Sequence, residues 1–371
     1  MAESSSNKNP ANELDFGSDD DSNNSEKSVD SSEESDKKSM VTLKKKIFLD
    51  DDEESDDDDY VPTTKKQTNK KQFAASSTIE PIIGDRPMID YILPDANKYS
   101  YKSWPQCFPD KKVVLRSLIF NPGWNEFFNI IEKKPYFKNM ESILSDCLSK
   151  GNETILPYAE LVFNTLNVLA PNQIVVVIIG QDPYPGANKI NGKLIPQATG
   201  FSFSVPLNYP KPESLKNIYS NMLLYSHINK IPESGCLSSL VIQGCFMINA
   251  TLTTYYTKRN VHKNIWKNFT DDLLAYINKS CKNVVFMVWG KDAHIMCKYI
   301  DPYKHHIITS SHPSPLGFNK TFNGYAYGPV KNERDRKEVT YPPFQTTDHF
   351  GRVNSYLKSV SKREIFWDLI D

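Results

Sequence analysis

Four short segments of the chain are apolar at nearly every position, and they constrain the fold more than any other feature of the sequence. They are Ile174 to Ile179 (IVVVII), Cys245 to Asn249 (CFMIN), Val284 to Trp289 (VVFMVW) and His306 to Ser310 (HIITS). Strands that are apolar throughout, rather than at alternate positions, are typical of a parallel sheet covered by helices on both faces. We therefore predict four parallel strands at the centre of the molecule.

The segments between the predicted strands carry helical patterns. Residues Ser214 to Ile228 are rich in Leu, Tyr and Met, and apolar residues recur at intervals of three and four between Ile265 and Ile277. These patterns predict an α/β fold, with a central four-stranded parallel sheet flanked by helices. We expect it to form a single domain over residues 86–371.

Residues 1–85 differ in composition from the rest of the chain. Residues 1–60 hold 20 acidic and 7 basic side chains, which leaves 37 basic and 25 acidic side chains in the remainder of a chain whose formal net charge is -1. This polar, low-complexity segment cannot bury enough apolar surface to offset the entropy of ordering it, so we expect a disordered acidic tail. The basic remainder suits binding to a polyanion such as nucleic acid.

Several classes of protein are excluded by what the sequence lacks. Its longest apolar runs are far shorter than the ~20 residues of a membrane helix. The N-terminal sequence MAESSSNK does not have the charged and then apolar pattern of a secretory signal. The six cysteines are scattered, with no CxxC pair that would indicate a zinc or iron–sulfur site. We expect an intracellular monomer with free thiols and no membrane association.

Polar and glycine-containing sequences follow all four predicted strands. They are GQDPYPG (Gly180 to Gly186), NATLT (Asn249 to Thr253), WGKDAH (Trp289 to His294) and SHPSPL (Ser311 to Leu316). In an open α/β sheet, ligands bind outside the carboxyl ends of the strands. A carboxylate, an amide, a glycine turn and an imidazole are thus expected at one edge. Such a set can perform acid–base chemistry, read the edge of a base and stabilise an anion.

These motifs resemble those of the family 1 uracil-DNA glycosylases, and the variant form resembles members from large DNA viruses. GQDPY with Asp182 is similar to the family's water-activating motif, and HPSPL with His312 is similar to its minor-groove intercalation loop. FSFSVP, KPESLKNIY and LSSLVIQGCFMINATLT match three further motifs. The similarity runs in order from Gly123 to the C-terminal FWDLI and leaves the N-terminal tail unmatched.

The resemblance implies a monofunctional enzyme that flips uracil out of DNA and hydrolyses its N-glycosidic bond, leaving an abasic site for base excision repair. The substrate would be uracil-containing DNA, either single- or double-stranded, and no metal or cofactor is implied. Asp182 would position water and stabilise the cationic sugar. A neutral His312 would donate a hydrogen bond to the uracil anion.

The resemblance also implies which residues hold the base. Phe203 would stack on it, and the Asn249 amide would donate to O4 and accept from N3–H, a pattern that cytosine reverses. Tyr184 would exclude the methyl group of thymine, and Gln181 would contribute to the same pocket. Four more residues would contact DNA, three at its phosphates and the last as an apolar wedge: Ser214, Gly290, Ser314 and Leu316.

The sequence departs from the common family pattern at four places. Pro185 stands where many members have a His, and Lys291 stands where a Ser often follows WG. Residues 187–200 and 318–344 are longer than usual. The GQDPYP form resembles poxvirus-like glycosylases, some of which serve replication as polymerase processivity subunits. A DNA-binding replication accessory is therefore an alternative function, and a glycosylase for another lesion is a second.

Ordinary structural explanations exist for the same residues. Asp182 before a proline can simply cap a turn, and Phe203 and Tyr184 can be core aromatics. The insertion at 318–344 is either a surface loop or a further contact to DNA.

Besides DNA, we expect a DNA polymerase or other replication proteins as partners. We expect the nucleus or a viral replication site as the place of action, with lysine clusters of the tail as import signals.

Overall fold

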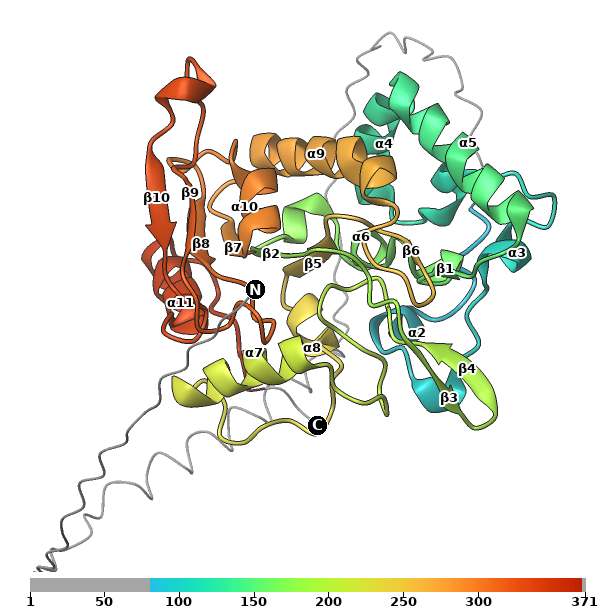
Figure 1. The fold of residues 1–371 in the computed structure, drawn as a ribbon, viewed down its shortest axis with the longest axis horizontal. Coiled ribbons are helices and arrows are strands. Elements are labelled where there is room, and N and C mark those ends of the chain that lie inside the picture. The colour runs from blue at the N-terminus through green and yellow to red at the C-terminus, as the bar shows by residue number, and fades with distance from the viewer. Residues whose placement is uncertain (1–80, 369–371) are drawn as a thin grey trace, which may run out of the picture. The chain divides into compact units, whose positions relative to one another are not determined.

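A four-stranded parallel sheet lies at the centre of the computed structural model, which describes residues 81–368 (Figure 1). The strands are β2 (Val176–Gly180), β5 (Cys245–Asn249), β7 (Val285–Trp289) and β8 (His306–Ser310). They pair in the order β5-β2-β7-β8, and every pair is parallel. All residues of β2, β5 and β7 are buried. The predicted α/β class and its four strands are confirmed.

The order of the strands determines where a ligand can bind. The chain passes from β2 to β5 on one side of β2 and then returns to β7 on the other side. Connections that leave a strand in opposite directions separate at its carboxyl end, and this switch point forms a crevice. Gly180 pairs with Asn249 in the register of β2 and β5, so these two strands end at the same level.

Helices cover both faces of the sheet, as Figure 1 shows. Helices α9 (Lys263–Ser280) and α10 (Lys291–Cys297) lie on one face, while α7 (Glu213–Leu224) and α8 (Ser238–Val241) lie on the other. The buried residues of α9 recur at intervals of three and four, which is why its sequence predicts a helix. Both predicted helices are confirmed, although α7 ends earlier than expected and α9 is longer at both ends.

The remaining elements surround this layered core. The other helices are α2 (Met88–Ile92), α3 (Trp104–Cys107), α4 (Asn125–Ile131), α5 (Pro135–Lys150), α6 (Asn164–Val168) and α11 (His349–Ser359). Three antiparallel pairs lie outside the central sheet: β1 (Ile155–Leu156) with β6 (Thr254–Tyr255), β3 (Ala187–Ile190) with β4 (Lys193–Pro196), and β9 (Phe322–Tyr325) with β10 (Glu338–Tyr341). Among residues 81–368, no helix combines the length and the apolar character needed to cross a bilayer.

Aromatic side chains fill much of the core beneath α9. Phe163, Trp266 and Phe269 have no exposed surface. The ring centroid of Phe163 lies 5.9 Å from that of Trp266 and 5.6 Å from that of Phe269. Full burial of a large apolar side chain contributes about 1.5–3 kcal/mol. This packing fixes α9 against the sheet and hence fixes the loops at the sheet edge.

Both segments that are longer than usual form antiparallel hairpins. The β3–β4 hairpin turns at Asn191 and Gly192, whose φ angles of 50° and 79° are typical of a tight two-residue turn. The β9–β10 hairpin contains Arg336, which is 6% exposed and donates from Nη1 to the carbonyls of Ala326 and Gly328, each at 2.9 Å. The second insertion is therefore a folded element with its own buried cation.

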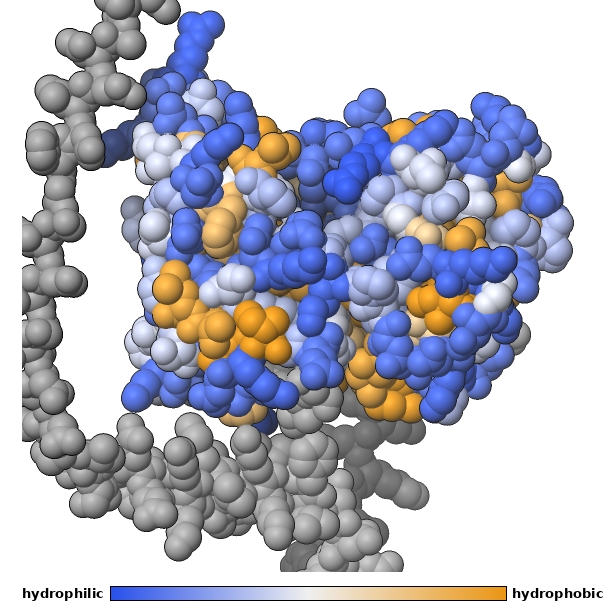
Figure 2. Space-filling view, turned by 60° about the horizontal axis from the view of Figure 1, so that its bottom comes forward, coloured by the Kyte–Doolittle hydropathy of each residue, from blue (hydrophilic) through white to orange (hydrophobic). Residues whose placement is uncertain are grey.

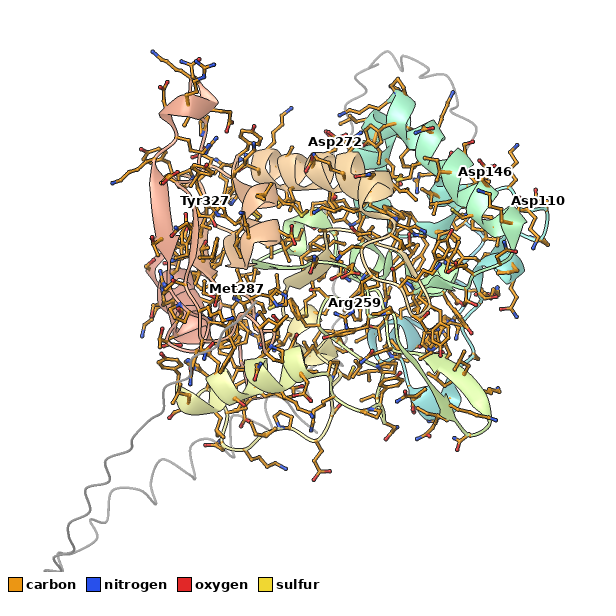
Figure 3. All side chains as sticks on the ribbon, in the orientation of Figure 1. Asp110, Asp146, Arg259, Asp272, Met287 and Tyr327 are labelled. Carbon is orange, nitrogen blue, oxygen red and sulfur yellow. The ribbon has the colours of Figure 1, made fainter. Side chains whose placement is uncertain are left out.

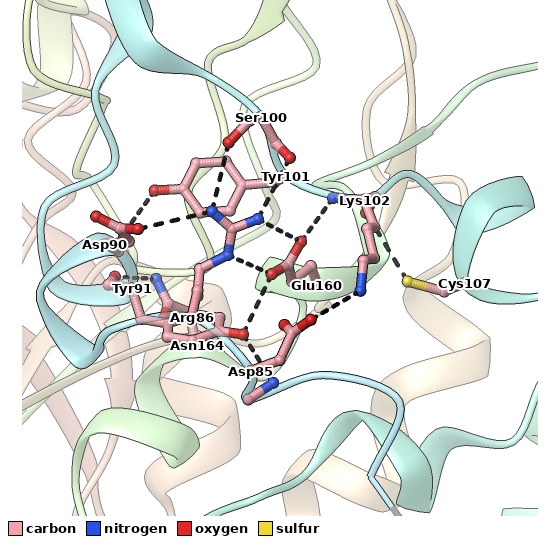
Figure 4. A network of polar contacts seen from close by, with 11 residues as sticks. Asp85, Arg86, Asp90, Tyr91, Ser100, Tyr101, Lys102, Cys107, Glu160 and Asn164 are labelled. Carbon is pink, nitrogen blue, oxygen red and sulfur yellow. Dashed lines mark hydrogen bonds and ion pairs between the residues drawn. The ribbon is translucent and has the colours of Figure 1, made fainter.

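A buried carboxylate attaches the start of the described chain to the domain (Figure 4). Glu160 has no exposed surface. It accepts hydrogen bonds from Arg86 Nη2 at 3.1 Å, from the Tyr91 hydroxyl at 3.2 Å and from the Lys102 backbone N–H at 2.6 Å. The Tyr91 hydroxyl accepts in turn from the backbone N–H of Gly84 at 2.9 Å. Because a buried charge must be paired and hydrogen-bonded, this network determines where Arg86 lies.

Most of the predicted tail lies outside the described residues. The predictions for residues 1–80, which are disorder and import signals, therefore stay predictions, as does the domain boundary between residues 85 and 86. Residues 81–85 are described, and there the backbone N–H of Ile82 donates to the carbonyl of Ser117 at 2.9 Å.

Some hydrophobic side chains reach the surface, in separate places. Leu223 and Leu224 at the end of α7 are 41% and 61% exposed, and Ile242 just after α8 is 61% exposed. Figure 2 turns the α7 side of the molecule forward and shows hydrophobic areas that are divided by hydrophilic ones. Scattered exposure of this kind is ordinary for a protein surface and needs no functional explanation.

Candidate active site

A pocket lies at the carboxyl edge of the sheet, where β2 and β5 end. The loop after β2 and several other segments line it: Gly180, Gln181, Asp182, Pro183, Tyr184, Pro185, Ala198, Gly200, Phe201, Phe203, Ser214, Asn249, Arg259 and His312. The structure therefore brings together seven of the ten predicted site residues: Gln181, Asp182, Tyr184, Phe203, Ser214, Asn249 and His312. Residues far apart in the sequence meet here because parallel strands deliver their loops to one edge.

Asp182 occupies the tight turn that follows β2. Its Oδ2 accepts a hydrogen bond from the backbone N–H of Asn260 at 2.9 Å, while Oδ1 has no protein donor among residues 81–368. Burial raises the pKa of this carboxyl above its ordinary value, and the nearby charge of Asp292 adds to the rise. The Asn260 N–H and the positive charge of Arg259 oppose it. One oxygen is thus fixed, and the other can accept from a water molecule.

His312 is held in one tautomer. Its Nδ1 accepts a hydrogen bond from the backbone N–H of Ser314 at 3.0 Å. Because the accepting nitrogen carries no proton, the neutral ring carries its proton on Nε2. Burial lowers the pKa of the imidazole to about 4, although Asp292 opposes the shift. At neutral pH His312 is therefore an uncharged hydrogen-bond donor.

Gly290 leaves the space that His312 needs. It has a φ of 88° and directly follows β7, and a Cβ atom at this position would stand 2.9 Å from Cβ of His312. Both the left-handed backbone and the close approach require glycine. Gly290 therefore contributes to the site by leaving room for the side chain of His312.

Asn249 stands at the end of β5, beside Gly180 of β2. It is 8% exposed, and within residues 81–368 its side-chain amide makes no hydrogen bond. A Cβ atom at Gly180 would lie 2.2 Å from Oδ1 of Asn249, so only glycine leaves room for the amide. The donor and the acceptor of this amide are both left for a ligand.

Phe203 and Tyr184 form the apolar walls. Phe203 is 7% exposed and has a φ of 62°, which is costly for a bulky residue and persists only where the surroundings impose it. Its ring centroid lies 5.3 Å from that of Trp289 and 5.8 Å from that of His312. The Tyr184 hydroxyl donates to the carbonyl of Phe203 at 3.4 Å, which connects the two walls.

Tyr184 also packs against a second hydrophobic cluster, separate from the main core. Its members come from the N-terminal segment, from β4 and from neighbouring loops: Tyr91, Ala96, Tyr99, Tyr101, Leu161, Ile195, Val205 and Tyr209. Ile195 lies on the β3–β4 hairpin and is 2% exposed. The insertion at 187–200 therefore supports one wall of the pocket.

Two further predicted residues lie on the loop after β8, outside the pocket lining. Ser314 holds the ring of His312 through its backbone N–H. Leu316 is 82% exposed, so it has no packing role in the free protein. Asn217 of α7 donates to the carbonyl of Pro313 at 2.7 Å and thereby fixes this loop to the helix that carries Ser214.

Three residues that were not among the predicted site residues contribute to the site. Arg259 lines the pocket, and Asn260 donates to Asp182. Asp292 accepts a hydrogen bond from Gln181 Nε2 at 2.9 Å, so the Gln181 side chain is directed to a carboxylate rather than left free for a ligand. Asp292 belongs to the WGKDAH segment, for which only Gly290 was predicted as a site residue. No motif covers Arg259 and Asn260.

Within residues 81–368, no group of three or more His, Cys, Asp or Glu side chains is arranged to hold a metal ion.

Comparison with known proteins identifies the family. Residues 167–338 match the sequence model described as the uracil DNA glycosylase superfamily. A probable uracil-DNA glycosylase of Acanthamoeba polyphaga mimivirus is 50% identical over 288 residues, which are 78% of this chain and 75% of the relative. The chain belongs to the uracil-DNA glycosylase family.

Other members and a solved structure agree. The uracil-DNA glycosylase of Borreliella burgdorferi (strain ZS7) is 41% identical over 244 residues, which are 66% of this chain and 96% of the relative. The crystal structure of mimivirus uracil-DNA glycosylase is 50% identical and superposes with a TM-score of 0.73, covering 77% of this chain and 100% of that chain. The resemblance to uracil-DNA glycosylases and the fold that it implies are confirmed.

Proposed function

We propose that this protein is a monofunctional uracil-DNA glycosylase, which flips uracil out of DNA, hydrolyses its N-glycosidic bond and leaves an abasic site for base excision repair. The observation that carries the proposal is the pocket in which Asp182, His312 and Asn249 meet beside Phe203. Extrusion of a base costs a few kcal/mol, which contacts in such a pocket offset. Its substrate is uracil-containing DNA.

Asp182 activates the water and stabilises the sugar. Cleavage leaves positive charge on the sugar, and an ionised carboxylate beside it lowers the energy of that state. The hydrogen bond from Asn260 fixes Oδ2. Oδ1 then accepts from the attacking water and orients it toward the sugar carbon.

His312 stabilises the leaving uracil. The departing base carries negative charge at O2, and the Nε2–H of a neutral imidazole donates to that oxygen. The hydrogen bond from Ser314 maintains this tautomer before the substrate arrives. Loss of one such preorganised donor costs about 2.7–4 kcal/mol of barrier, which corresponds to a rate lower by about 10²–10³. We therefore expect His312→Leu to bind DNA normally and to react slowly.

Three residues recognise the base. The unbonded amide of Asn249 donates to O4 and accepts from N3–H of uracil, whereas cytosine presents the opposite pattern. Phe203 stacks on the ring. Tyr184 fills the space beside C5, where thymine carries a methyl group. The backbone of Gln181 contributes to the same pocket, since its side chain is bonded to Asp292.

The DNA contacts lie around the pocket mouth. Ser214 at the start of α7 and Ser314 contact phosphates through their hydroxyl groups, which position the strand without reading its sequence. The backbone N–H of Gly290 already donates to the carbonyl of Ser310, so Gly290 contributes to DNA binding by leaving room for His312. Leu316 enters the duplex from the loop after β8 and fills the gap that the flipped nucleotide leaves. Its 82% exposure in the free protein is consistent with this use.

Single-turnover release of uracil tests the function. The protein and its Asp182→Asn variant are compared on a duplex and on a single strand, with a chelator and no added metal. We expect rapid release that collapses in the variant. If the wild type binds DNA but releases no uracil, the alternative of a DNA-binding replication accessory takes the place of the enzyme.

We propose separately where the enzyme acts, in what assembly and with which partners; the similarity to a viral glycosylase supports the location alone. The enzyme acts as a monomer at a viral replication site or in the nucleus, beside a DNA polymerase or other replication proteins. Sedimentation of the purified protein checks the monomer. Co-purification from infected cells with a DNA polymerase checks the partner, and a chain recovered without any replication protein would count against it.

A further inference from the structure

A short segment after β6 is held against the turn that carries Asp182. The backbone N–H of Thr257 donates to the carbonyl of Pro185 at 2.9 Å, and that of Asn260 donates to Oδ2 of Asp182 at 2.9 Å. Thr257 and Asn260 have φ angles of 64° and 58°, so the segment turns sharply at both anchors. Arg259 lies between these anchors and is therefore carried at the pocket.

Within residues 81–368, Arg259 has no ion-pair partner. Its neighbours in the sequence are paired, Lys258 with Glu153 and Lys263 with Asp292. Arg259 itself is exposed, lines the pocket and forms no ion pair with any of residues 81–368. Gly180 of β2 and Ser214 of α7 line the same pocket, and Figure 3 labels Arg259 near the centre of the molecule.

The position of this charge is unfavourable for the reaction unless an anion accompanies it. Arg259 acts electrostatically on both Asp182 and Tyr184. A cation beside Asp182 weakens the negative field that the developing sugar cation needs. A bound anion would cancel that effect. The anion that arrives with a flipped nucleotide is a phosphate of the DNA backbone.

We propose that Arg259 binds a backbone phosphate next to the flipped nucleotide and positions the strand over Asp182. The inference rests on the proposed function, because a base that enters the pocket brings its flanking phosphate to the rim. A planar guanidinium binds phosphate with two parallel hydrogen bonds. Pro185 on the same rim has no polar side chain, so it cannot supply such a contact.

The test compares Arg259→Ala with a matched control, Arg363→Ala. Arg363 is also exposed. Its neighbour Lys362 donates to the carbonyls of Lys282 and Asn283, which lie just before β7 at the amino end of that strand, whereas the pocket lies at the carboxyl ends of the strands. Binding to a duplex with a non-hydrolysable deoxyuridine analogue is measured by fluorescence anisotropy over a series of salt concentrations. Loss of one phosphate contact reduces the slope of log K against log [salt] by about 0.9.

We expect Arg259→Ala to lose affinity and about 0.9 of the slope, while Arg259→Lys regains the slope because it restores the charge. The single-turnover rate of Arg259→Ala should also fall at a higher pH than that of wild type, since the cation no longer opposes the raised pKa of Asp182. The pH limb reports the charge of Arg259 beside Asp182, whereas the salt slope reports the phosphate contact; a purely structural role would move neither. Thermal unfolding checks that all variants are folded.

The two proposals fail in different ways. If wild type releases uracil and Arg259→Ala has the affinity and slope of Arg363→Ala, the role of Arg259 is wrong and the function stands. If wild type binds the duplex but releases no uracil, the function is wrong. The slopes then still decide whether Arg259 contacts phosphate.

Discussion

The backbone N–H of Ser314 donates a hydrogen bond to Nδ1 of His312, and this one contact sets the protonation of the ring. Burial lowers the pKa of His312 to about 4. We therefore predict that His312 is neutral, with its proton on Nε2, throughout the neutral pH range and gains charge only as the pH falls toward that value. Nitrogen NMR of labelled protein checks this. An imidazolium signal at neutral pH would contradict it.

The raised pKa of Asp182 predicts the acid limit of activity. Only the ionised carboxylate stabilises the sugar cation, and burial places the pKa of this group above the ordinary 3.8. The single-turnover rate should therefore be constant at neutral pH and should fall as the pH drops through a value above 3.8. Asp182→Asn should show a low rate without this limb. If the limb persists in the variant, another group is responsible for it.

Asn249 should determine the choice between uracil and cytosine. Asn249→Asp replaces the amide by a carboxylate, which accepts from the N4 amine of cytosine. The variant should release cytosine from an unmodified duplex, where wild type releases none, and should lose part of its activity on uracil. Asn188, an exposed residue of β3, supplies the control Asn188→Asp. If Asn249→Asp releases no cytosine, Asn249 is not the residue that distinguishes uracil from cytosine.

Tyr184 should exclude thymine, with help from the hairpin behind it. Tyr184→Ala should admit thymine, because the space beside C5 is then open. Ile195→Ala should weaken this exclusion to a smaller degree, since Ile195 belongs to the cluster that supports Tyr184. The ratio of kcat/KM for uracil and thymine measures both effects. Leu194 on the same strand is 48% exposed, so Leu194→Ala should leave the ratio unchanged.

Leu316 should matter for duplex DNA alone. Leu316→Ala removes an apolar side chain that fills a gap, and such a gap exists only in a duplex. Burial of a leucine contributes about 1.5–3 kcal/mol, so release from a duplex should slow by about tenfold or more. Release from a single strand and the melting temperature should not change. An equal loss on both substrates would place Leu316 in the chemistry instead.

The sheet and most of the site could be predicted because their signals are local. A continuous apolar run indicates a buried parallel strand, and the residues that follow it must lie at the carboxyl edge. This reasoning, with the family motifs, located Asp182, Asn249 and His312 without knowledge of any contact. Gln181 was predicted as well, but the role of Asp292 and its hydrogen bond with Gln181 emerge only from the structure.

Arg259 and Asn260 could not be predicted in this way. They follow no strand of the central sheet, and they reach Asp182 only because the chain turns through left-handed conformations at Thr257 and Asn260. Such turns depend on tertiary contacts as much as on residue type. In the hairpin at 187–200, the dipeptide Asn191-Gly192 is typical of a two-residue β-turn. The packing of the hairpin against Tyr184, however, depends on a tyrosine cluster from a distant segment.

The pairing of Arg86 with Glu160 sets a lower limit on how much of this chain is needed for activity. A protein shortened beyond Arg86 would retain every residue of the pocket and the whole of residues 167–338. It would nevertheless leave a carboxylate with no exposed surface unpaired. Breaking such a pair costs about 3–5 kcal/mol, a large share of the ~5–15 kcal/mol that holds a domain folded. We therefore expect the stability of the region that carries the chemistry to depend on a guanidinium far upstream of the first catalytic motif.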